Sequence, residues 1–262
     1  MTTTVAVEKS VNRIELEQKV KDMYEQVARD PFGEFHFELG RALAERLGYM
    51  KTDLDRIPRE AVDSFAGVGY YFDLAAIEPG ETVLDLGSGS GMDSFIAALR
   101  TGANGKVLGV DMTDAQREKA ERLRDRDGFV NVSYHKAYIE HTPFADNSID
   151  AVISNGVINL AADKAAVFRE AARLLKPGAR LAISDIITEK ELPEGVTCNA
   201  TLWAACIGGA LQQDRYTDAI REAGLRLVTL RSNPQYHFLT ASAQKACATY
   251  GVKSVSLLAI KD

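Results

Sequence analysis

A loop with three closely spaced glycines is the clearest sign of chemistry in this sequence. The segment VLDLGSGSGMD places Gly87, Gly89 and Gly91 directly after a strand-like run and at the start of a helix-like run. Glycines at such a junction let a ligand approach the backbone closely. Asp111 ends the next strand-like run, 20 residues beyond Gly91, where an acid accepts hydrogen bonds from ribose hydroxyls. The spacing therefore indicates a site for a ligand that contains a ribose.

The loop departs from the dinucleotide pattern GxGxxG, and the departure bears on the charge of the ligand. Met92 stands where that pattern has its third glycine, and Asp85 and Asp93 flank the loop. Two carboxylates disfavour a bound pyrophosphate but suit a ligand with ribose and positive charge, such as the ammonium and sulfonium of S-adenosylmethionine. A tight turn without a ligand is the alternative. We predict S-adenosylmethionine as cofactor, bound in part by Asp85, Gly87, Ser88, Gly89, Gly91 and Asp111.

The segment YIEHTPFADNSIDAVISN adds a second group of candidates. Tyr138, Ile139 and Glu140 follow the third predicted strand, where an adenine edge would lie beside the glycine loop. A backbone N–H near Ile139 and the carboxylate of Glu140 could address adenine, with Met112 packed on the face of the ring. The alternative is that this segment is a solvated turn.

The segment VISNGVINL ends an apolar strand in Asn155 and Gly156. Asn-Gly favours a hairpin, whereas glycine at a strand end also allows a ligand to approach the backbone. The run lies within a series of alternating strands and helices and is followed by a helix, so a hairpin would break the series. We therefore expect this corner at the carboxyl end of a parallel strand, where such sheets bind ligands.

Strand and helix patterns alternate along most of the chain, which predicts an α/β fold with a mainly parallel sheet covered by helices on both faces. An amphipathic helix over 8–29 and a second helix ending at Gly48 precede the sheet, in a predicted lid and connector over 1–78. The cofactor-binding domain is predicted over 79–262, with a helical insertion over 188–217. The segment 232–251 fits no element. The predicted strands are 82–87, 106–111, 131–136, 149–155, 180–187, 225–231 and 253–261, and the predicted helices of this domain are 92–102, 114–128 and 163–178.

Composition limits the partners. The net charge is −6 and lysines and arginines are scattered, which argues against nucleic acid and anionic membranes. No signal peptide or membrane-length apolar run is recognised, so a cytoplasmic location is expected. The cysteines and histidines lack the spacing of a metal site or a disulfide framework. They are Cys198, Cys206, Cys247, His36, His135, His141 and His237.

In order and spacing, these blocks resemble the class I S-adenosylmethionine-dependent methyltransferases, and more narrowly the arsenite methyltransferase-like subgroup. The resemblance rests on VDSFAGVG, VLDLGSGSGMD, VLGVDMT, VISNGVINL with DKAAVF, and LWAACIGGAL, and covers about residues 21–224. It implies a Rossmann-like fold with a seven-stranded sheet and transfer of the sulfonium methyl group in a cap-covered cleft. It also implies that Tyr24 and the FAGVG turn, with Gly67, close over the methyl group.

The cysteines depart from the pattern of members that methylate trivalent arsenic. Those members have a cysteine where this chain has Gly156, a second where it has Cys206, and usually more near the N-terminus. Trivalent arsenic is thiophilic and needs two or three thiolates. We therefore predict a small organic acceptor, with Asn155 on the cofactor side and Gly156 leaving room on the acceptor side. The alternative is that Gly156 is a conformational residue and Cys198 or Cys247 completes an arsenic site with Cys206.

Three functions remain open at this point. They are methylation of a small organic molecule, methylation of arsenite through Cys206 and another thiol, and cofactor binding without catalysis. The catalytic candidates are His36, which lies among phenylalanines in the predicted lid, and Cys206. Each also has a structural interpretation. His36 would be a histidine packed among aromatic rings, and Cys206 would be a leftover of an ancestral arsenic site or a residue of the pocket wall. The partner is predicted to be a small-molecule acceptor, and the protein a monomer or homodimer.

Overall fold

The sheet carries the architecture of this protein. The computed structural model describes residues 12–197 and 207–262. Seven strands lie in the order β3-β2-β1-β4-β5-β8-β7, with β6 paired to β5, and all pairs are parallel except those of β8. The strands are β1 Thr82–Leu86, β2 Lys106–Asp111, β3 Val132–Lys136, β4 Ile149–Asn155, β5 Leu175–Thr188, β6 Leu211–Gln212, β7 Leu225–Ser232 and β8 Lys253–Lys261.

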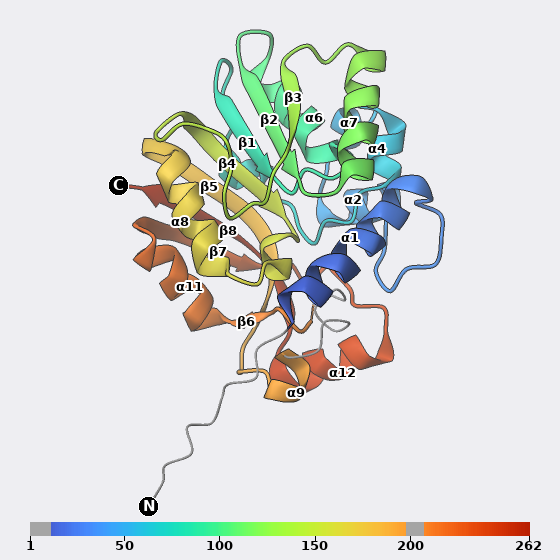
Figure 1. Ribbon diagram of the computed structural model, residues 1–262, viewed down its shortest axis with the longest axis vertical. Helices are drawn as coiled ribbons and strands as arrows, with labels where there is room; N and C mark the ends of the chain where they lie inside the picture. The colour runs from blue at the N-terminus through green and yellow to red at the C-terminus, as the bar shows by residue number, and fades with distance from the viewer. Residues whose placement is uncertain (1–11, 198–206) are drawn as a thin grey trace, which may run out of the picture.

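Helices cover both faces of this sheet (Figure 1). They are α1 Arg13–Arg29, α2 Arg41–Leu47, α3 Lys51–Leu54, α4 Arg59–Asp63, α5 Phe72–Ala75, α6 Met92–Thr101, α7 Asp114–Asp127, the 3-10 turn η1 Ile158–Leu160, α8 Lys164–Leu174, α9 Glu194–Thr197, α11 Gln213–Glu222 and α12 Ala241–Tyr250. Successive strand residues point to opposite faces. Val83 of β1 packs in the cluster with α2 to α7, and Leu84 and Leu86 pack in the cluster with α8 and α11.

The predicted α/β fold with its mainly parallel sheet is confirmed. The strands predicted over 106–111, 149–155 and 253–261 have the observed bounds, and the others differ by a residue or two at their ends, except β5. Two parts of the prediction need correction, at the start of β5 and in the insertion over 188–217.

The helix predicted over 163–178 ends at Leu174, and β5 begins at Leu175. Proline disfavours the helical conformation in the residue before it, so the chain becomes extended ahead of Pro177. The pairing of β4 with β5 shifts register here, passing from Ile149 opposite Leu175 to Ala151 opposite Arg180.

The insertion over 188–217 is not wholly helical in its described part. Leu211 and Gln212 form β6, which extends the sheet beside the last residues of β5. Gln212 also caps the start of α11 by accepting hydrogen bonds from the backbone N–H groups of Asp214 and Arg215. α11 begins inside the predicted insertion and ends beyond it, at Glu222. The segment 232–251, which fitted no pattern, contains α12.

The helix predicted over 8–29 is α1 in its described part, and Asn12 caps it by accepting hydrogen bonds from the backbone N–H groups of Ile14 and Glu15. α1 packs along α7 (Figure 1). Lys119 of α7 is buried and donates hydrogen bonds to the carbonyl of Ala28, at 2.9 Å, and to the hydroxyl of Ser64, at 2.7 Å. Because Ala28 lies in the last turn of α1, this lysine holds that end of the helix on the domain.

Gly91 shows why the loop before α6 needs glycine. Its φ is +95°, and an added Cβ would lie 2.2 Å from the hydroxyl of Tyr134 and 2.9 Å from the ring of Phe95. Gly91 therefore meets two constraints, a left-handed backbone and the close approach of a buried ring.

Replacing Gly91 with alanine is expected to lower the free energy of unfolding by about 2–4 kcal/mol, because backbone strain and overpacking add. The matched control is Gly128→Ala at the end of α7, where φ is +73° and nothing lies within 4 Å of an added Cβ. That control should lose only the backbone contribution, about 1 kcal/mol. Urea denaturation of both variants gives the comparison, and equal losses would contradict the steric argument.

Candidate active site

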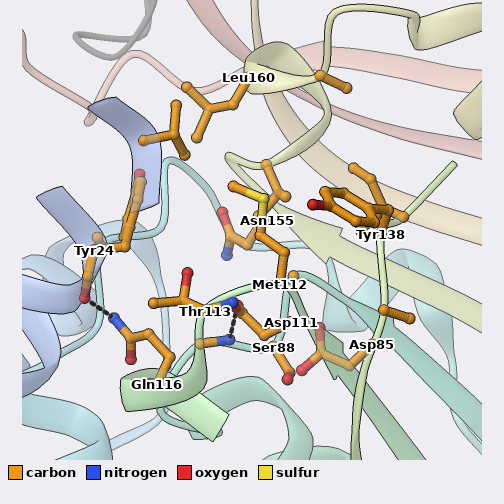
Figure 2. Close-up of a pocket in the computed structure, with 18 of the residues that line it drawn as sticks. Tyr24, Asp85, Ser88, Asp111, Met112, Thr113, Gln116, Tyr138, Asn155 and Leu160 are labelled. Carbon is orange, nitrogen blue, oxygen red and sulfur yellow. Dashed lines mark hydrogen bonds between the residues drawn. The ribbon is translucent and has the colours of Figure 1, made fainter. Parts of the chain in front are cut away.

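A cavity of about 490 Å³ lies at the carboxyl ends of β1, β2 and β4. Parallel strands bring their carboxyl ends to one edge, so loops far apart in sequence meet there. Figure 2 shows the labelled side chains around this cavity, with Tyr24 of α1 on one side and Tyr138 on the other. The cavity therefore joins the N-terminal helix to the sheet edge.

Most of the predicted binding residues line this cavity. The lining residues among them are Tyr24, Gly67, Asp85, Gly87, Ser88, Gly89, Asp111, Met112, Tyr138, Ile139, Glu140 and Asn155. Gly91, Gly156 and His36 are not among the described lining residues. Cys206 lies outside the residues that the structure describes.

Asp111 joins the end of β2 to the glycine loop. One carboxylate oxygen accepts a hydrogen bond from the backbone N–H of Gly89 at 3.0 Å, and the other accepts one from the N–H of Thr113 at 2.8 Å (Figure 2). Burial raises the pKa of Asp111, and these two hydrogen bonds oppose the rise. Since a carboxylate offers about four acceptor positions, Asp111 keeps capacity for ligand hydroxyls.

Asp85 and Asp93 lie deeper, and the structure changes the charge argument made from sequence. Burial, and then the neighbouring Asp93, raise the pKa of Asp85 to about 8, so its carboxyl is mostly protonated at neutral pH without a ligand. Its one described side-chain partner is the hydroxyl of Ser94, which donates to it at 2.6 Å. The sequence argument that Asp85 and Asp93 would repel a pyrophosphate with two full negative charges is therefore overstated. At neutral pH a nearby cation is needed to make Asp85 mostly negative.

The residues predicted for adenine lie together on the loop after β3. Glu140 is partly buried, and burial raises its pKa. Tyr138 is 48% exposed, and its hydroxyl donates a hydrogen bond at 2.6 Å to Glu17 of α1. Lys21 contacts the same hydroxyl at 3.2 Å and lies over the Tyr138 ring. Tyr138 therefore spans from the sheet edge to α1.

α1 forms a wall of the cavity that the sequence analysis assigned only at Tyr24. Leu16, Val20 and Tyr24 are spaced by four residues and share the face that lines the cavity. Gln116 of α7 donates a hydrogen bond to the carbonyl of Tyr24 at 2.8 Å (Figure 2). It also accepts one from the hydroxyl of Ser90, in the glycine loop, at 2.5 Å. The helical spacing of Leu16 and Val20 with Tyr24 could have identified them from the sequence as cavity-lining residues. No sequence feature distinguishes Gln116 from the other polar residues of its charged helix.

Gly156 has the conformational role that the sequence analysis kept as its alternative. Its φ is +72°, and an added Cβ would lie 3.2 Å from the side chain of Val68. Val68 lies beside Gly156, and Gly156 is not among the described lining residues, so the room expected there for the acceptor stays a prediction. Val157, the next residue, does line the cavity.

The remaining candidates lie away from the cavity. His36 packs edge-on against Phe37, with ring centroids 4.7 Å apart, and Phe37 in turn stacks on Tyr24 at 6.1 Å. It supports the α1 wall from behind and is not placed to act as a base. Cys247 of α12 is half-buried and packs against an apolar cluster that includes Leu16, Val20 and Val68, and burial raises the pKa of its thiol.

Within 12–197 and 207–262, no group of acidic, histidine or cysteine residues is arranged to hold a metal ion.

Comparison with known proteins identifies the family. Residues 77–224 match the family model described as a methyltransferase domain. The chain belongs to this methyltransferase family. Arsenite methyltransferases are similar to it: that of Halobacterium salinarum is 40% identical over 187 residues, 71% of this chain and 48% of the relative. The human arsenite methyltransferase is 42% identical over 159 residues, 56% of this chain and 42% of the relative.

A solved structure of an arsenic methyltransferase is also similar to this chain. CrArsM, an arsenic(III) S-adenosylmethionine methyltransferase from Chlamydomonas reinhardtii, has a TM-score of 0.64 and 32% identity and covers 85% of this chain and 73% of its own. The chain thus falls in the arsenite methyltransferase-like subgroup. It spans about half the length of the curated relatives it matches. The [4+2]-cyclase SpnF, at 16% identity and a TM-score of 0.61, shares the fold alone.

The cavity fits a nucleoside cofactor. The hydroxyl of Ser88 is buried on the cavity wall and has no hydrogen-bond partner in the described part of the chain. Asp111 retains acceptor capacity beside it, and an added Cβ at Gly89 would have no atom nearer than 3.8 Å, so there is open space on that side of the loop. An unmatched buried hydroxyl favours a ligand that hydrogen-bonds to it.

None of the helices in the two described stretches could cross a membrane.

Asp85→Asn is expected to stabilise the ligand-free protein, by an amount that grows with pH. The pKa of Asp85 is raised, so the folded protein binds more protons than the unfolded chain between about pH 4 and pH 8, and its stability falls across that window. The variant lacks this loss and should gain on the order of 1 kcal/mol or more at pH 8. The free energy of unfolding measured in urea at pH 5, 6.5 and 8 provides the test.

Asp150→Asn serves as the control of opposite sign. Burial raises the pKa of Asp150, but hydrogen bonds from Lys176 and from the backbone of Thr82 outweigh this and lower it. Its contribution to stability is present above about pH 4 and lost as the pH falls through its folded-state pKa. This variant should therefore be less stable than wild type at pH 5 to 8. A pH-independent difference at Asp85 would contradict the assignment.

Proposed function

We propose that this protein is an S-adenosylmethionine-dependent methyltransferase that acts on a small-molecule acceptor. One observation carries the proposal: the cavity brings the glycine loop, Asp111 and the loop after β3 together beside a wall contributed by α1. The match of residues 77–224 to the methyltransferase domain family supports it independently. A cytoplasmic location is part of the proposal, and so is the absence of a nucleic-acid partner, which the net charge of −6 supports.

The lining residues suggest how the cofactor is held. Asp111 would accept hydrogen bonds from the ribose hydroxyls, while Asp85 and the hydroxyl of Ser88 would face the charged amino-acid end. The loop at Ile139 and Glu140 would hold adenine. When bound, this cofactor supplies a sulfonium methyl group that is open to attack by a nucleophile.

The protein contributes mainly orientation and exclusion of water. The charge of a sulfonium is dispersed as the methyl group is transferred to a neutral acceptor, so a dry cavity favours the reaction. Leu16, Val20 and Leu160 provide apolar wall, and Tyr24 covers one side. Among the lining residues that the structure describes there is no histidine, lysine or cysteine. The described wall thus suits an acceptor that is already nucleophilic, with carboxylates as its only bases.

A small organic acceptor remains our proposal for the finer question of substrate. Gly156 leaves its corner without a thiol, and Cys247, the one cysteine in the described residues, is not on the wall. Arsenite methylation is the second candidate, because the relatives at about 40% identity are named arsenite methyltransferases. It would rest on Cys206 and Cys198. Cofactor binding without turnover is the third.

Asp111→Ala is expected to weaken S-adenosylmethionine binding by about 10- to 100-fold, the equivalent of one or two charge-assisted hydrogen bonds. Isothermal titration calorimetry measures the change. Asp114→Ala is the control, since that carboxylate is exposed and pairs with Lys136 at 2.6 Å, away from the cavity lining. Binding that is equally strong in wild type and Asp111→Ala would contradict the assignment of the ribose site, and no binding to wild type would overturn the proposed function.

A panel of thiols, phenols, amines and arsenite, assayed for S-adenosylhomocysteine release, tests the acceptor. We expect turnover with an organic nucleophile and little with arsenite, because a single thiolate holds arsenic poorly. Cys206→Ser should then retain organic turnover, with Cys247→Ser as the cysteine control. Rapid arsenite turnover that Cys206→Ser abolishes would favour the arsenic alternative.

A further inference from the structure

Asn155 lines the cavity, but both ends of its side-chain amide are engaged by the protein. Its carbonyl oxygen accepts hydrogen bonds from the backbone N–H groups of Val68, at 2.8 Å, and Gly69, at 3.3 Å. Its amino group lies 3.0 Å from the carbonyl of Gly69, 3.0 Å from the hydroxyl of Tyr49 and 3.2 Å from a carboxylate oxygen of Asp93. An amide offers two N–H donors and one oxygen, so these contacts use its capacity.

Asp93 anchors this arrangement in the core. It lies in the first turn of α6 and is 6% exposed. The hydroxyls of Tyr49 and Tyr71 each donate a hydrogen bond to it at 2.7 Å. Burial raises the pKa of Asp93, and the hydrogen bonds from Tyr71, Tyr49 and Asn155 oppose the rise. The amide of Asn155 therefore joins a fixed buried acceptor to the backbone of residues 67–69.

The segment 66–69 is closely packed on both sides. An added Cβ at Gly67 would lie 2.6 Å from the amide nitrogen of Asn155, and one at Gly69 would lie 2.6 Å from the hydroxyl of Ser184. On the far side, Ser254 donates a hydrogen bond at 2.6 Å to the carbonyl of Val68. Ala66 and Gly67 line the cavity, so the backbone that these contacts fix is itself part of the wall.

We propose that Asn155 is a positioning residue for methyl transfer: it clamps segment 66–69 against Asp93 and so sets the position of the wall that faces the acceptor. This rests on the proposed methyltransferase function. The sequence analysis predicted Asn155 as a cofactor ligand, but a direct ligand keeps polar capacity for its ligand, as the buried hydroxyl of Ser88 does and this amide does not. A misplacement of about 1 Å in a reacting assembly can cost 100-fold in rate.

The test compares Asn155→Ala with Asn131→Ala, a matched loss of a partly buried asparagine that bonds to Ala98 and Gly102 away from the cavity. Amide hydrogen exchange at Val68 and Gly69 should accelerate at least about tenfold in Asn155→Ala and stay unchanged in Asn131→Ala. S-adenosylmethionine affinity by calorimetry should change less than about threefold in both. The kcat for S-adenosylhomocysteine release, with the best acceptor of the thiol, phenol, amine and arsenite panel, should fall about 10- to 100-fold in Asn155→Ala alone.

Asn155→Asp adds a signature that loss of stability alone does not give. A carboxylate there faces the carboxylate of Asp93 and the carbonyl of Gly69, both acceptors, and the hydroxyl of Tyr49. Asp85 is the next acid in the core, beside Asp93. A protonated carboxyl at position 155 can donate to one of the two acceptors. The ratio of variant to wild-type kcat, and the protection of the two amides, should therefore be higher at pH 6 than at pH 8.

The inference is overturned if Asn155→Ala weakens S-adenosylmethionine affinity more than about tenfold, which marks a direct ligand. It is also overturned if the two amides keep their protection, or if kcat stays at the wild-type value after protection is lost. Wild-type protein that neither binds S-adenosylmethionine nor releases its product overturns the proposed function instead. In that case the exchange rates of the two variants still decide whether Asn155 holds the segment.

Discussion

The carboxylate of Asp111 holds the glycine loop against the end of β2, and the geometry of the cavity depends on that attachment. The loop needs left-handed backbone at Gly87, Gly89 and Gly91, which gives it little intrinsic rigidity. The backbone N–H of Gly89 bonded to this buried carboxylate, and the N–H groups of Gly87 and Ser88 bonded to the carbonyl of Val110, fix it to β2 instead. Because the same carboxylate keeps acceptor positions for a ligand, the group that shapes the site is also able to bind in it.

Burial of acids gives this cavity a preference for cations. Asp85, Asp93, Asp111 and Glu140 all line it, and burial raises the pKa of each. Desolvated acids reduce the stability of the ligand-free fold and are relieved when positive charge enters. The fold thus tolerates a local loss of stability where it binds its ligand, as functional sites often do.

Local patterns made the sheet and the glycine loop predictable. The predicted strands are short and mostly apolar runs that alternate with helices, and Asp111, the acid predicted to bind ribose, lies at a fixed distance along one strand-helix-strand unit. Contacts between distant segments left no such pattern. Tyr49 meets Asp93 across 44 residues and Gln116 meets Tyr24 across 92, so neither Asn155 as a clamp nor Gln116 as a support of α1 could be read from spacing. Val68, which lies beside Gly156, is equally remote in sequence.

The two sides of the cavity come from different parts of the chain, which bears on what determines the acceptor. The glycine loop, Asp111 and Glu140 lie within residues 77–224, the region shared with the methyltransferase domain family. Leu16, Tyr24 and Gly67 lie before it. A fold shared by many reactions supplies the cofactor side, while function is set by the residues added around it. Under the proposed function, the wall formed by α1 and segment 66–69 is where a change of residues would alter the choice of acceptor and leave the residues proposed for the nucleoside in place. Asn155 and Gln116 are two of the contacts that tie that wall to the shared domain, with Lys119 and Tyr138 as others.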